Sequence, residues 1–284
     1  MSITARALLV EHSISVWTAN KLDKNATDVV ISQNYAADKA AQVRKNLMAG
    51  SSQRKDIADF AAGCRLWHNV KTLPWMDRGA RLLPTSLFME YKSEANKRRQ
   101  QFHDMVDQFL EDYPTLVTTA SNYMGSLFDP SDYPSVGEVE SKFGYRLVFS
   151  PVPEAGDFRL DVAANDLKEM QQSYERSYND RINEAMKDTW QRLHKQLTSM
   201  SEKLADNKDD SVKKRYHDSL ITNAQELCGM LTHLNITKDP ELEKARKQLE
   251  LTLLGANMDT LKESSQARGE MKTKLDNILG QFEW

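Results

Sequence analysis

The segment that decides the fold is LKEMQQSYERSYNDRINEAMKDTWQRLHKQLTSMSEKL, residues 167–204. An apolar residue recurs at every third or fourth position, at Leu167, Met170, Tyr174, Tyr178, Ile182, Met186, Trp190, Leu193, Leu197, Met200 and Leu204. This spacing places the apolar residues along one side of an α-helix. At 1.5 Å per residue the segment predicts a rod of about 57 Å, and its apolar stripe must be buried.

A second striped helix follows the rod after a polar break at residues 206–210. Its apolar positions are Val212, Tyr216, Leu220, Ala224, Leu227, Leu231 and Leu234. A short break between two such helices predicts an antiparallel helical hairpin, although a homodimer would bury the stripe equally well. Asp239 and Pro240 predict the start of a last helix. Gly255 and Gly269 weaken that helix, so residues 262–284 are expected to be partly detached.

The first 164 residues mix two periodicities. Alternation over residues 7–17 predicts a strand, with His12 on its apolar face. Helical spacing is found over residues 26–48, 54–68, 85–125 and 135–143. Residues 145–149 and 157–162 alternate and predict a β-hairpin beside the N-terminal strand. We expect a mainly α-helical α+β protein, with an N-terminal helical head that carries a small antiparallel sheet (1–164) and a C-terminal helical hairpin or coiled-coil-like bundle (165–284).

The composition narrows the class of protein and its compartment. The chain has 284 residues, a net charge of −3, 28% charged residues and a mean hydropathy of −0.63. No window approaches the roughly 18 apolar residues of a membrane span, and the N-terminus lacks the apolar core of a signal peptide. Cys64 and Cys228 are far apart and predict two buried, reduced thiols. We therefore expect a cytoplasmic protein without a membrane partner.

The segment VKTLPWMDRGARLLP, residues 70–84, is the strongest candidate for a functional loop. Two prolines, a glycine and a tryptophan between helices indicate an ordered loop, and such loops often carry function. Trp75, Asp77, Arg78 and Arg81 would bind a partner if they are exposed. In the alternative interpretation Trp75 is buried as a structural plug, and Asp77 and Arg78 only make contacts within the turn.

Two basic clusters raise the prospect of nucleic-acid binding. One comprises Lys92, Lys97, Arg98 and Arg99 on a predicted helix, and the other comprises Lys213, Lys214 and Arg215. Basic residues neutralise phosphates, and neighbouring aromatic rings can stack on bases. Acidic neighbours in both clusters favour the simpler interpretation of solvated helix faces.

No catalytic, metal or cofactor motif is found in the sequence. There is no Gly-x-Ser-x-Gly elbow, no phosphate-binding glycine loop and no dinucleotide fingerprint. His103 and Asp107 stand four residues apart, a spacing that fits two metal ligands, but no second pair accompanies them. We therefore expect no enzymatic activity, no cofactor and no metal.

Four motifs in order resemble an uncharacterised family of tailed-bacteriophage proteins, a domain of unknown function. They are WTANKLD at residues 17–23, TLPWMDRGARLLP at 72–84, LFDPSDYP at 127–134 and PVPEAGDFRL at 151–160. The resemblance spans about residues 1–165 and implies a phage origin and action in the bacterial cytoplasm. Such genes often neighbour genes of MoxR-type ATPases, which implies an adaptor role. The family offers no catalytic residues to transfer to this chain.

The sequence thus predicts a non-enzymatic interaction protein that binds a protein partner or a second copy of itself. The alternative is a DNA-binding accessory factor in phage replication or recombination that acts through the two basic clusters.

Overall fold

The structure, a computed structural model, describes residues 3–76, 79–153, 164–205, 216–282 and 284. The chain forms two compact units that are interleaved along the sequence. Unit 1 consists of Met1–Glu11, Asn69–Met89 and Val148–Trp284, and unit 2 consists of His12–His68 and Glu90–Leu147. The expected division at residue 164 does not coincide with the units, because two short N-terminal segments pack with the C-terminal helices.

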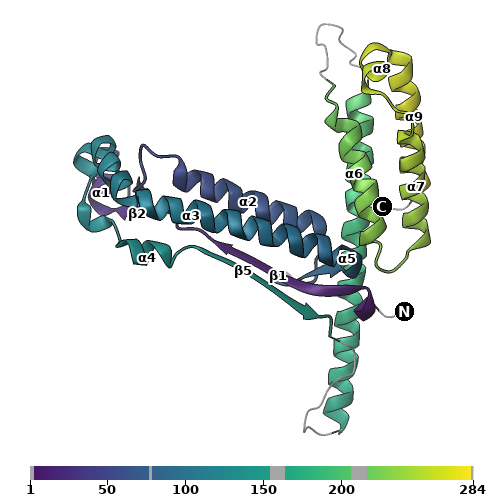
Figure 1. The fold of residues 1–284 in the computed structure, drawn as a ribbon, viewed down its shortest axis with the longest axis horizontal. Helices are drawn as coiled ribbons and strands as arrows, with labels where there is room; N and C mark the ends of the chain where they lie inside the picture. The colour runs from purple at the N-terminus through teal and green to yellow at the C-terminus, as the bar shows by residue number, and fades with distance from the viewer. Residues whose placement is uncertain (1–2, 77–78, 154–163, 206–215, 283) are drawn as a thin grey trace. The chain divides into compact units, whose positions relative to one another are not determined.

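A mainly α-helical fold with a small antiparallel sheet is confirmed (Figure 1). The strands are β1 (Ala7–Ser15), β2 (Asn20–Asp23), β3 (Val43–Asn46), β4 (Arg81–Pro84) and β5 (Gly144–Pro151). The α-helices are α1 (Lys24–Gln33), α2 (Gln53–Lys71), α3 (Phe88–Met124), α4 (Val136–Glu140), α5 (Ala164–Leu204), α6 (Ser219–Leu234), α7 (Pro240–Leu253), α8 (Met258–Glu263) and α9 (Ser265–Gln281). Short 3-10 helices lie at Ile3–Ala5, Thr85–Leu87, Gly125–Leu127 and Pro130–Asp132. Across the described residues, no helix has the length and apolar character needed to cross a bilayer.

Four helices of unit 1 form a bundle in which neighbours run in opposite directions (Figure 1). Helix α5 packs against α6 and α9, and α7 packs against the same two helices. The second half of the stripe on α5, from Leu193 to Leu204, is buried in their shared core. The predicted antiparallel hairpin is therefore confirmed, and two further helices complete its cover.

The expectation of a partly detached tail is wrong. Helix α9 packs on α5 and buries Met271, Leu275 and Ile278, which are spaced three and four residues apart. Gly255 adopts a left-handed φ of +75°, so it turns the chain between helices rather than weakening the last one. Ser264 then caps α9 by accepting a hydrogen bond from the backbone N–H of Ala267 at 3.1 Å.

The sheet has the strand order β4-β1-β5. In unit 1 the start of β1 pairs antiparallel with β4, in a register that sets Ala7 opposite Pro84 and Val10 opposite Arg81. Strand β4 lies in a segment whose composition predicts a loop, and it becomes a strand through its pairing with β1. The expected partner of β5 at residues 157–162 lies outside the described residues, whereas the predicted place of β5 beside the N-terminal strand is confirmed.

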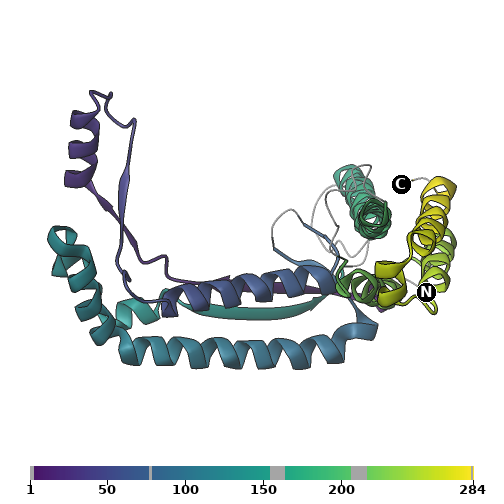
Figure 2. The ribbon, with the colours of Figure 1, turned by 90° about the horizontal axis from the view of Figure 1, so that it is seen from above.

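In unit 2, α2 and α3 lie side by side, as Figures 1 and 2 show. Helix α2 buries Ile57, Ala61 and Cys64, which recur every three or four residues as the sequence predicts. Helix α3 presents a matching stripe to the same core, with Phe102, Val106, Phe109, Tyr113 and Leu116. Helical spacing therefore located both helices correctly.

An arm formed by β2, α1 and β3 stands apart from this helix pair in Figure 2. The helix expected over residues 26–48 is correct only as far as Gln33. Left-handed φ angles at Tyr35 (+50°) and Lys39 (+70°) interrupt it. Residues 43–46 then form β3, which pairs antiparallel with β2. Long-range pairing has overridden the helical propensity of this alanine-rich stretch, which is a weak determinant by itself.

Removal of the Leu275 side chain tests the packing of α9. Leu275 is fully buried, whereas Leu254 is 76% exposed. We expect Leu275→Ala to lower the free energy of unfolding by about 2–4 kcal/mol because it opens a cavity. Leu254→Ala should lower it by less than about 0.5 kcal/mol. Urea titration followed by circular dichroism measures both values, and equal effects of the two substitutions would contradict this packing.

Candidate functional site

A concave surface within unit 1 is lined by two of the predicted site residues, Trp75 and Arg81. This Trp75 groove has a volume of about 990 Å³ and opens to solvent. One wall is the segment that follows α2, and the other is the N-terminal half of α5. Its lining consists of Pro74, Trp75, Met76 and Arg81 from the segment and Ser173, Arg176, Ser177, Asp180, Arg181 and Glu184 from α5.

Two backbone hydrogen bonds between Leu73 and Leu82 join the two ends of the segment that carries Trp75. The backbone N–H of Leu73 donates to the carbonyl of Leu82 at 2.8 Å, and the N–H of Leu82 donates back at 2.9 Å. Both side chains are fully buried. Arg81 reinforces this closure, because its Nε donates to the hydroxyl of Thr72 at 2.8 Å. The described residues of this wall, 73–76 and 79–82, are therefore joined by backbone and side-chain hydrogen bonds.

Arg192 fixes this segment onto α5. Its guanidinium donates to the carbonyl oxygens of Val70 at 2.8 Å, Asn69 at 3.0 Å and Thr72 at 2.8 Å. Asp188, one turn earlier on α5, holds the guanidinium through an ion pair at 2.7 Å. The last carbonyls of a helix have no partners within the helix, so an arginine fork that binds three carbonyls stabilises the point where α2 ends.

Trp75 forms the floor of the groove. Only 5% of the residue is exposed, and its ring meets that of Tyr178 edge-on at a centroid distance of 5.6 Å. The guanidinium carbon of Arg181 lies 5.6 Å from the Trp75 ring centroid, within cation–π range. The structure thus agrees with the plug interpretation, and an exposed role for Trp75 is not seen. Asp77 and Arg78 lie outside the described residues.

The charged residues of α5 form the rim of the groove. Arg176 donates a hydrogen bond to the carbonyl of Gln172 at 3.3 Å, and the guanidinium of Arg181 lies over the Trp75 ring. Neither arginine forms an ion pair with any residue that the structure describes, and the same holds for Asp180 and Glu184. Spacings of three and four residues placed these side chains on one face of α5, but nothing in the sequence indicated that this face meets the Trp75 segment.

The basic cluster of α3 is partly committed to contacts inside unit 2. Arg98 forms an ion pair with Glu94 at 2.8 Å, and its guanidinium carbon lies 4.9 Å from the ring centroid of Trp67. Lys92, Lys97 and Arg99 are exposed. The second cluster, Lys213, Lys214 and Arg215, lies outside the described residues. Of the two predicted clusters, the described residues thus include only the one on α3.

A second group of chemically capable side chains lies inside unit 2, around His12. The His12 ring centroid lies 5.0 Å from that of His68 and 4.9 Å from that of Tyr145. Both ring nitrogens of His12 are buried without a hydrogen-bond partner among the described residues. His68 differs, because its Nδ1 lies 2.7 Å from the hydroxyl of Tyr91. Among the residues that the structure describes, no three His, Cys, Asp or Glu side chains converge as metal ligands.

The surroundings of His12 disfavour its protonated form. Burial lowers the pKa of His12 to about 4, and the nearby positive charges of Arg65 and Arg98 act in the same direction. An unpaired imidazolium in this position would be costly, so His12 is neutral near pH 7. The His12 nitrogens form no hydrogen bonds with the described residues. Replacing His12 with an apolar ring of similar size would therefore break none.

Arg192→Gln should test the clamp at the end of α2. The variant removes the donors from Arg192 to Asn69 and Val70 and one of the two donors to Thr72, whose carbonyl keeps a hydrogen bond from Arg81 at 3.3 Å. We expect the free energy of unfolding to fall by about 1–2 kcal/mol. Arg176→Gln, which loses one exposed hydrogen bond, serves as the matched control and should cost less than about 0.5 kcal/mol. Urea titration measures both. If the two variants are equally stable, the clamp is not what holds the segment.

His12→Phe should reduce the loss of stability in acid. Because the folded pKa of His12 lies below its usual 6.5, its stabilising contribution is complete above that value and is lost as the pH falls toward 4. Relative to the variant, we expect the wild type to lose about 2 kcal/mol between about pH 7 and pH 4. Chemical unfolding at both pH values gives the difference. His103→Phe, at an exposed position, should show no such effect, and parallel pH profiles for wild type and His12→Phe would refute the assignment.

Comparison with profiles of known protein families, with curated proteins and with solved structures finds no significant match to this chain. The resemblance of residues 1–165 to phage proteins therefore stays a prediction that rests on its four motifs.

Proposed function

We propose that this chain is a non-enzymatic interaction protein that binds a segment of a partner protein in the Trp75 groove. The observation that carries the proposal is the groove itself: an open concave surface with a rigid aromatic floor and a rim of charged side chains without ion-pair partners in the described residues.

The composition of the groove supports protein recognition. Binding hot spots are enriched in tryptophan, tyrosine and arginine, and they sit where rigid side chains exclude water. Trp75 is only 5% exposed and packs against Tyr178 and Arg181, so it would support the groove from below while Arg176 and Arg181 contact a partner. Met76 is half exposed at the same wall and adds an adaptable apolar contact.

The charges of the rim favour a polypeptide over a nucleic acid. Arg176 and Arg181 alternate with Asp180 and Glu184 along the same face of α5. A phosphate backbone would meet repulsion from both carboxylates, whereas a peptide with side chains of both signs can pair with each charge. The DNA-binding alternative depends instead on the two basic clusters. In the first, Arg98 is engaged by Glu94 and Lys92, Lys97 and Arg99 are exposed. The second, Lys213, Lys214 and Arg215, lies outside the described residues.

The resemblance to phage proteins supports a more specific form of the proposal. In that form the chain is encoded by a phage, acts in the bacterial cytoplasm as an adaptor and has a MoxR-type ATPase as its protein partner. A second copy of the chain is the competing occupant of the groove, which would make the protein a homo-oligomer.

Reversal of the two rim arginines tests the proposal. The immobilised full-length chain is used to retain proteins from the bacterial cells in which it is made, and each retained protein is then purified and its Kd measured. We expect Arg176→Glu/Arg181→Glu to weaken binding at least about tenfold, because both substitutions turn attraction into repulsion. Lys195→Glu/Lys274→Glu changes the net charge equally at exposed positions outside the groove and should leave the Kd within about twofold.

Three outcomes would count against the groove: the wild type retains nothing, the retained protein still binds the arginine variant, or both variants weaken binding equally. Sedimentation of the wild type identifies self-association, and a dimer that only the arginine variant dissociates would place a second copy in the groove. For the DNA alternative, a filter-binding assay across salt concentrations should show a salt slope that Lys97→Glu/Arg99→Glu reduces.

A further inference from the structure

Helix α1 is unusual because none of its residues is buried. It has 10 residues and contains Val29, Val30 and Ile31 in succession, with Val29 51% exposed. A helix this short is marginal in water by itself, and most helices are stabilised by burying an apolar face. The apolar residues of α1 are therefore left with little cover from the described residues of this chain.

An arm groove lies beside α1 within unit 2. It has a volume of about 650 Å³ and is formed by α1, the β2–β3 ribbon and the turn at residues 126–130. Val29 and Val30 of α1 line it, Leu127 and Phe128 of the turn line it as well, and Val43 of the ribbon completes its apolar surface. Leu127 is 45% exposed. The apolar side chains of three elements thus meet at one open groove.

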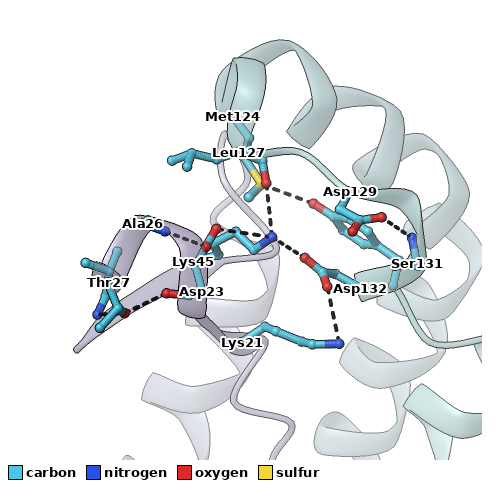
Figure 3. Close-up of polar contacts among 12 residues, drawn as sticks. Lys21, Asp23, Ala26, Thr27, Lys45, Met124, Leu127, Asp129, Ser131 and Asp132 are labelled. Atoms are coloured by element: carbon cyan, nitrogen blue, oxygen red, sulfur yellow. Dashed lines mark hydrogen bonds and ion pairs between the residues drawn. The ribbon is translucent and has the colours of Figure 1, made fainter. Parts of the chain in front are cut away.

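One buried lysine holds these three elements together (Figure 3). The ammonium of Lys45 on β3 donates to the carbonyl of Leu127 at 3.2 Å, forms an ion pair with Asp132 and lies 3.5 Å from Asp23. Asp23 also caps α1 by accepting from the N–H of Ala26 at 2.9 Å. The Lys45 side chain is only 8% exposed, and its charge is balanced by the two carboxylates. The groove is therefore formed before any partner arrives.

The open rim of the arm groove carries a negative charge. Asp129 is exposed and accepts a hydrogen bond from the N–H of Ser131 at 2.9 Å. No cation forms an ion pair with Asp129 among the residues that the structure describes. An occupant with a basic side chain near this position would complement the rim.

We propose that the arm groove binds an amphipathic helix of a partner protein, with the apolar face of that helix against Val29 and Leu127 and a lysine or arginine beside Asp129. Helix-in-groove recognition uses this arrangement, in which apolar residues at helical spacing enter a groove and charges at its edge set orientation. The site lies in unit 2 and does not depend on the Trp75 groove, so either proposal stands if the other fails. Two separate surfaces would let the chain bridge two partners.

The test uses a synthetic 15-residue amphipathic helix with leucines at helical spacing and one flanking lysine, and a second peptide in which glutamine replaces that lysine. Each is titrated into the isotope-labelled full-length chain. We expect saturable shifts of the backbone amide signals of Ala26, Val30 and Leu127. Val29→Ser should weaken the lysine peptide about tenfold through lost apolar contact. Val136→Ser, at a position 41% exposed on α4, is the matched control and should change the Kd less than about twofold.

Asp129→Asn keeps the shape of the rim and removes only its charge. It should weaken the lysine peptide about twofold to fivefold and leave the glutamine peptide unchanged. The proposal is overturned if these signals show no saturable shift up to about 1 mM peptide. It is also overturned if Val136→Ser weakens binding as much as Val29→Ser, or if Asp129→Asn affects both peptides alike. Stronger binding to anionic lipid vesicles than to the lysine peptide would likewise overturn it.

Discussion

The hydrogen bonds from Arg192 to three backbone carbonyls are the interaction on which the candidate site depends. Asn69, Val70 and Thr72 present these carbonyls where α2 ends, and Arg192 supplies donors that the last carbonyls of a helix lack within the helix. Because Arg192 lies on α5, satisfying these carbonyls also brings the following segment against α5. One guanidinium thus both binds the last carbonyls of α2 and holds the Trp75 segment on α5, where the groove forms.

This arrangement changes the part that Trp75 plays. From the sequence, Trp75 is either an exposed side chain that reaches a partner or a buried plug beneath its own loop. The structure buries the ring against Tyr178, and the charged residues of α5 lie at the rim. A partner would therefore be recognised by the charged side chains of α5 that surround Trp75. Charge pairing of this kind contributes more to specificity than a large apolar contact does.

Unit 2 contains two buried polar groups with opposite arrangements. Around Lys45 each charge has a partner of opposite sign, and the network ties a short helix, a two-stranded ribbon and a turn into one arm. Around His12 the ring nitrogens have none within the described residues, so the neutral ring is tolerated only while it stays unprotonated. The first network gives the arm groove its shape, and the second makes the stability of unit 2 sensitive to acid.

Apolar periodicity by itself determined the long helices, because burial of one face is a local pattern that repeats along α2, α3 and α5. Local signals also located the cap at Asp239 and the short helix α4. Only the tertiary structure decided the rest: residues 43–46 became a strand through pairing with β2, and residues 81–84 became one through pairing with β1. Helix α9 is held by α5, despite its weak intrinsic pattern. Strand pairing and the Arg192 clamp join residues far apart in the chain, and no local spacing encodes which of them meet.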